Sequence, residues 1–362
     1  MKKRVLFSPL AIIISIAFLL SSTSLYAQEK ERKIMLKVPV CFATVLPGLG
    51  TTMPWVAERI EVASGGSLRM KVYEPGKLVA PFEILDAVSK GKINGGYSIS
   101  GYWAGKIPAA PIFSAIPFGP EAGEFLAWMY YGNGMKLYQE MYDQAGYNIK
   151  VFLCGIIAPE TSGWFSKPIN SLEELKGLRM RFYGLGGKAL ERLGVSTSIL
   201  PGGEIFPALE KKAIEATEFS MPAIDKRLGF HKVTKYNYFP GWHQQATVFE
   251  LLINKDVYNS MSAQQKMIME LITKAATVDA FAMTEAIQAA AMRENVEKHG
   301  VKNMYWSQEM LDAFHTAWKE TAEEQASEDP FFKKVWDDIS AFRAEYKLWQ
   351  TYGFLPRPEP PK

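Results

Sequence analysis

The chain has 362 residues, of which 48% are hydrophobic, and its 41 basic residues exceed its 38 acidic residues by three. The whole excess lies in Lys2, Lys3 and Arg4, so the rest of the chain is electrically balanced. A nucleic-acid or anionic-membrane surface needs a basic excess, which this balance excludes. The length suggests two lobes of ordinary globular composition.

The first 27 residues have the pattern of a secretory signal. The three basic residues precede an apolar run over residues 5–20, and small or polar residues follow as far as Ala27. This pattern predicts cleavage after Ala27 and export from the cytoplasm. The alternative, an uncleaved membrane anchor, needs about 20 apolar residues, and this run is shorter. Because no cysteine stands at the cleavage point, we expect no lipid anchor.

Cys41 and Cys154 are the only cysteines of the sequence, and each lies in an apolar run typical of a buried strand. In an oxidising compartment they can form a disulfide where the geometry permits, so the sequence leaves both pairing and simple burial open. The four histidines are dispersed, with no close His/Cys cluster in the sequence. This argues against a zinc site.

Strand-like and helix-like segments alternate in the N-terminal part of the chain. Periodicity and Gly/Pro breaks predict helices over 53–63 and 82–90. This alternation favours an α/β fold with a parallel sheet covered by helices. The last predicted strand of this part should carry the chain from the first lobe to the second. The predicted strands are 33–44, 68–75, 93–103 and 151–158.

Residues 171–219 contain two candidate functional side chains. Ser171 and Glu174 have the spacing of a capping box. In the predicted strand 213–219, Glu218 is in phase with the apolar side, although a slip of one residue would place Glu215 there instead. A buried carboxylate needs a charge partner or a cation. The segment should otherwise contain strands at 178–183 and 196–200 and helices at 187–193 and 204–212.

Arg181, near the end of the predicted strand 178–183, is the candidate cation. Its guanidinium could bind a carboxylate through two parallel hydrogen bonds, although a solvated strand arginine is the simpler interpretation of the residue alone. The run 184–189 fits the dinucleotide pattern G-x-G-x-x-A. We do not favour that interpretation, because the following helix is short and an exported protein seldom meets free nicotinamide cofactor. The sequence has no G-x-S-x-G, P-loop or H-E-x-x-H motif.

The C-terminal part of the sequence is mainly helical after a strand at 247–258, which should return the chain to the first lobe. Ser262 and Gln265 predict a capped helix over 263–299, long enough to lie across both lobes. Apolar residues then recur at spacings of three and four. This seam fits either docking on the chain's own core or contact with a partner helix. Its residues are Phe332, Val335, Ile339, Phe342, Tyr346 and Trp349.

Several strings of the sequence resemble the solute-binding proteins of tripartite ATP-independent periplasmic (TRAP) transporters. They are GLGG, LPGGEIFPALE and PGWH, with YWAGKIPAA, AIPFGP and SGWFSKP. The resemblance covers essentially all of the mature chain and is strongest to the dimeric subgroup that binds 2-oxo and 2-hydroxy monocarboxylates with a metal ion. It implies two α/β lobes that close by hinge motion, a periplasmic location, TRAP membrane subunits as partners, and a homodimer formed through the final helix.

The resemblance also implies roles for individual residues. Arg181 matches the arginine that binds the solute carboxylate, and Glu218 matches an acidic metal ligand. Phe219 occupies the next position, whose backbone carbonyl also binds the metal. The remaining matches are Gln244, which should line the pocket, and Tyr102 and Trp103, which should form the aromatic wall of the first lobe.

Glu160 departs from the family pattern, because the keto-acid binders carry an amide metal ligand at this position, four residues before Trp164. If Glu160 is ionised, it and Glu218 outweigh Arg181 by one negative charge. Hard oxygen ligands of that charge favour calcium over sodium, or else a solute with a positive group. A shift in the local alignment that takes Glu160 out of the pocket is the alternative.

The expected division of the chain is a signal over 1–27, a first lobe over 28–155 and 246–285, a second lobe over 156–245 and 286–325, and a C-terminal helix over 326–362. The expected function is capture of a small organic acid for a TRAP transporter. Two alternatives stay open at this point: an exported metal-dependent enzyme with Glu218 and Glu160 as base and ligand, and a sensory receptor of the same fold.

Overall fold

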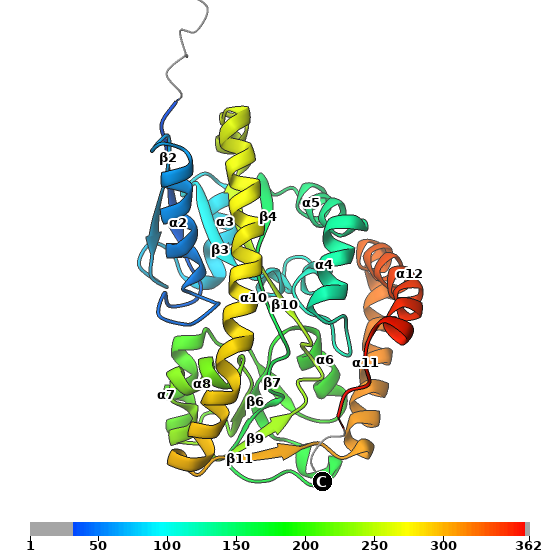
Figure 1. The fold of residues 1–362 in the computed structure, drawn as a ribbon. Helices are drawn as coiled ribbons and strands as arrows, with labels where there is room; N and C mark the ends of the chain where they lie inside the picture. Colours follow the sequence, from blue (N-terminus) through cyan, green and yellow to red (C-terminus); the bar gives the residue numbers. More distant parts are fainter. Residues whose placement is uncertain (1–31, 359–362) are drawn as a thin grey trace, which may run out of the picture.

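The computed structural model describes residues 32–358 (Figure 1). The expected signal and its cleavage point lie outside the described residues. No helix among the described residues is long and apolar enough to cross a membrane.

The first lobe is built on two small sheets. β1 (Ile34–Pro39) and β2 (Leu68–Tyr73) pair in parallel, and α2 (Thr52–Ala63) packs on them. In the second sheet, β10 (Thr247–Asn254) lies between β3 (Gly95–Ser98) and β4 (Ile149–Ile157). Around these sheets lie α3 (Ile84–Ser89), α4 (Ala122–Tyr131), α5 (Gly134–Gln144), α9 (Lys255–Asn259) and short 3-10 helices at Pro81–Glu83, Ser100–Trp103 and Ala110–Phe113.

The prediction of a parallel sheet is wrong at the centre of the first lobe. β10 pairs antiparallel with both β3 and β4. The chain enters β10 as it returns from the second lobe. β10 can therefore pair antiparallel with its neighbours, without the crossover connection that a parallel pair requires. Every residue of β10 is buried. A strand buried on both faces shows no alternation that could reveal its direction or neighbours from the sequence.

The second lobe contains one mixed six-stranded sheet. β6 (Arg179–Arg181) is parallel to both of its neighbours, β7 (Ser196–Ser198) and β8 (Ala216–Thr217). β5 (Gly163–Phe165) pairs antiparallel with β8 on one side and with β9 (Tyr236–Phe239) on the other. The edge strands are β7 and β11 (Lys302–Tyr305). The helices of the lobe are α6 (Gly184–Arg192), α7 (Gly202–Glu210) and α8 (Pro222–Leu228), with 3-10 helices at Leu172–Leu175 and Phe230–Lys232.

One long helix, α10 (Ala263–His299), crosses both lobes (Figure 1). It packs on α2 and β4 in the first lobe and on α8 in the second. The predicted capping box of Ser262 and Gln265 is present, and the helix ends at Gly300 in the left-handed conformation. The other predicted box is wrong. Ser171 makes no side-chain cap, because the Glu174 carboxylate instead accepts the backbone N–H of Asn170 at 2.6 Å.

The last two helices connect the lobes along one flank of the molecule (Figure 1). α11 (Gln308–Glu328) packs on α6 of the second lobe, whereas α12 (Pro330–Gly353) packs on α4 and α5 of the first. The predicted seam is buried within the chain only in its first half, at Phe332, Val335 and Ile339. Farther along, Trp349 is 60% exposed. The start of α12 therefore docks on its own core, and its end remains open to a partner.

Both cysteines are buried and free. The disulfide that the sequence left open is not formed, and burial raises the pKa of both thiols.

Candidate functional site

A small cavity of about 10 Å³ lies between the lobes. Five of the predicted site residues line it: Tyr102 from the first lobe, and Glu160, Arg181, Phe219 and Gln244 from the second. Room for one water molecule is of the same order, so the lobes are closed over this space and must part to admit a solute. The rest of the lining is mostly apolar and comprises Phe42, Leu49, Ile99, Tyr183, Thr247 and Phe249.

Arg181 and Glu218 form a buried ion pair. Nη1 of Arg181 donates to Oε1 of Glu218 and to the Glu218 backbone carbonyl, both at 2.7 Å, and Nε donates to the Leu200 carbonyl at 3.3 Å. The Arg181 side chain is only 2% exposed, although it reaches the cavity. Since Nη1 and Nε are engaged, Nη2 is the donor that remains for a ligand. The arginine thus has one nitrogen, not a free two-pronged edge, to offer a carboxylate.

Glu218 is held in its ionised form. Burial alone would raise the pKa of this carboxyl group, but Arg181 and His243 outweigh burial and lower the pKa below its usual value. Oε1 also accepts the backbone N–H of Tyr183 at 2.5 Å. Oε2 has no hydrogen-bond partner and lies 3.7 Å from Nε2 of His243, beyond hydrogen-bond distance. One carboxylate oxygen is therefore left for another ligand.

Glu160 lies in the site, and the shifted alignment that would remove it is not what the structure shows. The residue is 3% exposed, and its Oε1 accepts the hydroxyl of Thr247 at 3.0 Å. Burial and the nearby charge of Glu218 raise the pKa of Glu160 well above its usual value. A second negative charge is thus unfavourable here unless a cation neutralises it.

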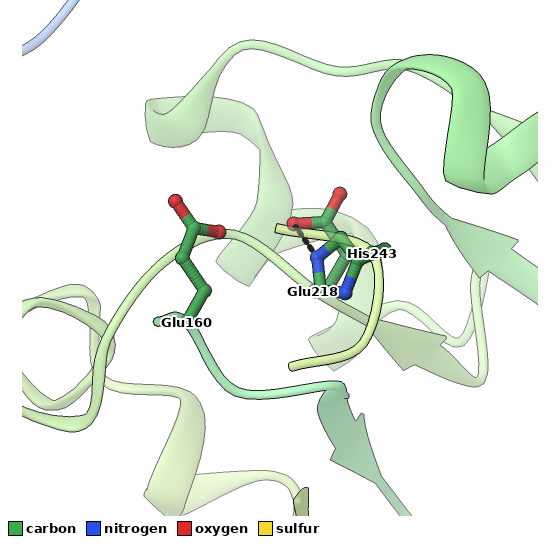
Figure 2. A group of neighbouring side chains, drawn as sticks. All are labelled: Glu160, Glu218 and His243. Carbon is green, nitrogen blue, oxygen red and sulfur yellow. Dashed lines mark ion pairs between the residues drawn. The ribbon is translucent and has the colours of Figure 1, made fainter. Parts of the chain in front are cut away.

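The unpartnered atoms of the site suit a cation. Carboxylate oxygens of Glu160 and Glu218 and a ring nitrogen of His243 all lie within 4.8 Å of one another (Figure 2). Oε2 of both glutamates, both His243 nitrogens and Oε1 of Gln244 are buried without a hydrogen-bond partner. Leaving buried acceptors unpaired is costly, and a bound cation would satisfy the three oxygens and at most one nitrogen of His243, since an imidazole ring has at most one acceptor nitrogen. The oxygens are the hard ligands typical of calcium and sodium sites.

Trp103 does not line the cavity, unlike its neighbour Tyr102. Its ring points into the first lobe, where Nε1 donates to Oε1 of the buried Glu250 at 2.7 Å. Tyr138 and Tyr142 donate to the other oxygen of Glu250. Burial raises the pKa of Glu250 to about 7 even though these three hydrogen bonds oppose the change. Trp103 is therefore placed to support the 3-10 helix that carries Tyr102, rather than to touch a solute.

The glycines of two characteristic strings have steric roles at the site. A Cβ at Gly186, in the GLGG string, would lie 2.8 Å from Cβ of His243. A Cβ at Gly241, in the PGWH string, would lie 2.0 Å from the Glu160 carbonyl oxygen. Only glycine permits these approaches. In the GLGG run, close packing on His243 thus accounts for Gly186 without a dinucleotide.

The lobes touch directly beside the cavity. The hydroxyls of Ser114, in the first lobe, and Tyr183, in the second, are 2.6 Å apart. The Tyr183 ring also packs edge-on against Tyr102, with ring centroids 5.8 Å apart. Because the backbone N–H of Tyr183 binds Glu218, this tyrosine links the ion pair of the second lobe to the surface of the first.

Sequence reasoning missed three residues of the site: Tyr183, His243 and Thr247. His243 is one of the four dispersed histidines of the sequence, yet it directly precedes the predicted pocket residue Gln244. That adjacency was the available signal, since a turn can place two neighbouring side chains at the same site. Thr247 begins β10, and nothing in its surroundings in the sequence marks it as a partner of Glu160.

Comparison with known proteins agrees with this geometry. A family model described as "DctP: Bacterial extracellular solute-binding protein, family 7" matches residues 50–329. The chain is 34% identical over 300 residues to a monocarboxylate 2-oxoacid-binding periplasmic protein of Nostoc sp. (strain PCC 7120), covering 83% of this chain and 82% of that protein.

Solved structures give the same assignment. A TRAP transporter solute-binding protein from Bordetella bronchiseptica, a mixed-occupancy dimer with copurified calcium and picolinate, has a TM-score of 0.86 and 27% identity, covering 89% of this chain and 95% of its own. One from Pseudoalteromonas atlantica, with bound sodium and pyruvate, has a TM-score of 0.85 and 31% identity, covering 89% and 97%. One from Colwellia psychrerythraea, with bound calcium and pyruvate, has a TM-score of 0.84 and 31% identity, covering 88% and 96%. The chain belongs to the DctP family of bacterial extracellular solute-binding proteins, the periplasmic receptors of TRAP transporters.

Proposed function

We propose that this receptor captures a small 2-oxo or 2-hydroxy monocarboxylate together with a metal ion. The observation that carries the proposal is the group of unpartnered acceptors around Glu160 and Glu218, directly beside a single buried arginine. Relatives that bind pyruvate with sodium or calcium support the same pairing of acid and metal.

Each residue would have a distinct role. Nη2 of Arg181 would donate to the solute carboxylate, while Glu218, Glu160, Gln244 and the backbone carbonyl of Phe219 would hold the metal. The metal would supply positive charge to the 2-oxygen of the solute. The apolar walls exclude water around the bound acid, which strengthens these electrostatic contacts. Among residues 32–358, only one arginine lines the cavity, which suits one carboxylate rather than two.

The direct test is mass spectrometry of the solute that copurifies with the native protein, with metal analysis of the same sample. We expect one monocarboxylate and one metal ion per chain, with the acid recovered unchanged. An exported metal-dependent enzyme would instead convert the acid, so accumulation of a product on prolonged incubation would contradict our proposal. A dicarboxylate or an uncharged sugar as the copurified solute would contradict it equally.

We propose that calcium is preferred to sodium because Glu160 places a carboxylate where the family resemblance implies an amide. In Glu160→Gln, calcium-supported binding of pyruvate should weaken about 10-fold or more, while sodium-supported binding should hold or improve. Calorimetry in calcium and in sodium buffers measures both affinities. Glu215→Gln is the matched control, since this exposed carboxylate pairs with Arg179 outside the site. An unchanged calcium-to-sodium ratio in Glu160→Gln would refute the preference.

We also propose a homodimer formed through the end of α12. Five large apolar residues gather there, each more than half exposed in the single chain. Such a patch is typical of an interaction surface. Sedimentation of the full chain at micromolar concentration should give the mass of a dimer, and a monomer would contradict this. The five residues are Leu348, Trp349, Tyr352, Phe354 and Leu355.

Two further assignments are proposals. Delivery to TRAP membrane subunits, rather than to a sensory receptor, is supported by the family and predicts that solute uptake is lost when the gene is deleted. The division into lobes over 28–155 with 246–285 and 156–245 with 286–325 is supported by which sheet each segment joins. Hydrogen exchange with and without solute should show protection concentrated where these segments meet.

A further inference from the structure

A second and much larger cavity, of about 550 Å³, lies on the first lobe. It is formed by the first turns of α10 together with β4, α4, α5 and α9, and none of its lining residues lines the solute site. Cavities of this size accommodate drug-sized ligands, roughly 300–1,000 Å³. Its lining is Tyr130, Met135, Lys150, Val151, Phe152, Leu153, Tyr258, Ala263, Lys266, Met267, Glu270, Thr273 and Lys274.

The charges in this cavity are unbalanced. It is lined by three lysines and one glutamate, and Glu270 already pairs with Lys274 at 2.7 Å. Among the described residues, Lys150 and Lys266 form no ion pair. Asp143, the other acid near Lys150, pairs with Lys255 at 2.6 Å. Lys266 donates to the backbone carbonyl of Asn259 at 3.4 Å, which still leaves N–H groups of both lysines available to an anion.

Of these two lysines, Lys150 gives the stronger indication of an anion site. Its side chain is half-buried on β4, and burial lowers the pKa of its ammonium group. The group lies 5.6 Å from the centroids of both the Phe152 and the Tyr258 rings. Lysine stems often cover apolar surface while the ammonium reaches water. Here the ammonium group instead lies over two aromatic rings. Its attraction to the ring faces offsets only part of the hydration free energy that it loses on burial.

We propose that this cavity binds a small organic anion with a flat apolar body. The carboxylate of such a ligand meets Lys150 and Lys266, and its body lies among Tyr258, Phe152 and Met267. Charge complementarity favours an anion, and the aromatic and methionine lining favours an apolar body over a sugar or a phosphate. The site is separate from the solute site and does not depend on the function proposed for it.

The probe is 2-naphthoate, titrated into the full exported chain by calorimetry. We expect one site per chain, binding that saturating pyruvate and calcium do not displace, and binding at least about 10-fold weaker for the neutral amide of the same ring. Lys150→Met, which keeps the stem, should weaken 2-naphthoate at least about 10-fold, and Lys150→Arg should keep most of the affinity.

Lys302→Met is the matched control, because Lys302 also lies over a tyrosine ring, at 5.5 Å from Tyr236, but does not line the cavity. It should leave the affinity for 2-naphthoate unchanged, and thermal unfolding of each variant confirms the fold. Three results would overturn the proposal: displacement of 2-naphthoate by pyruvate, equal affinity of Lys150→Met and the parent chain, or no saturable binding of the probe at all.

Discussion

Gly101→Ala is expected to weaken solute binding about 100-fold or more while leaving both lobes folded. A Cβ on Gly101 would lie 1.8 Å from the Tyr183 hydroxyl oxygen and 2.4 Å from Cζ of the same ring. Gly101 belongs to the first lobe and Tyr183 to the second, so the clash arises only when the lobes close. The next nearest atom is Oγ of Ser114, in the same lobe as Gly101, at 2.9 Å, and this hydroxyl can rotate away.

The size of this effect follows from the rigidity of the contact. Overpacking in a tight interior typically costs about 1–3 kcal/mol, and an approach of this kind against a buried ring should lie at the upper end. Calorimetry with pyruvate and calcium measures the affinity, and thermal unfolding without solute tests the fold. Gly105→Ala is the control, because a Cβ there meets nothing within 4 Å. An affinity for Gly101→Ala within about threefold of the parent would contradict the proposed closure contact.

The sequence could predict the residue types of the site better than their environment. Glu218 is buried as expected, but the strand expected over 213–219 contains only Ala216 and Thr217, and both of these are buried. The expected phase agrees with burial, because Ile214, Ala216 and Glu218 are buried whereas the Glu215 side chain is 40% exposed. Alternation did not predict that Thr217 is buried as well. The partners of Glu218 were not predictable from this segment, because Arg181 and Tyr183 are brought to it by a neighbouring strand and the residues that follow that strand.

Alternation also failed to separate the two arginines of β6. Arg179 and Arg181 share a side of the strand, yet the Arg179 side chain is 51% exposed and the Arg181 side chain 2%. The strand passes from solvent into the junction of the lobes within three residues. Only tertiary packing decides where that boundary falls, so the simpler interpretation of a solvated arginine is right for one and wrong for the other.

The contacts made over long sequence separation were the least predictable. Thr247 meets Glu160, and Trp103 meets Glu250, across 87 and 147 residues. Neither pair has a local pattern, because each depends on where β10 enters the first lobe. The long helix α10 was predictable for the opposite reason, since its cap, length and terminal glycine are all local signals.

Arg181→Met is expected to abolish measurable solute binding and also to destabilise the protein by about 3–5 kcal/mol. Both effects have the same origin. The substitution removes Nη2, which the proposed function assigns to the solute, and Nη1, which neutralises the fully buried Glu218. A charge left in the interior without its partner costs more than the ion pair contributed, so loss of binding by this variant alone could reflect a damaged fold.

Arg181→Met combined with Glu218→Gln separates these effects. The double variant leaves no buried charge at this pair, so most of the lost stability to urea should return. Binding of pyruvate should not return, because Nη2 and one metal-binding carboxylate are both absent. Glu218→Gln alone keeps Arg181 and should retain weak binding that no longer depends on calcium. Micromolar binding of pyruvate by the double variant would refute the role of Arg181, since stability would then have been restored without its guanidinium.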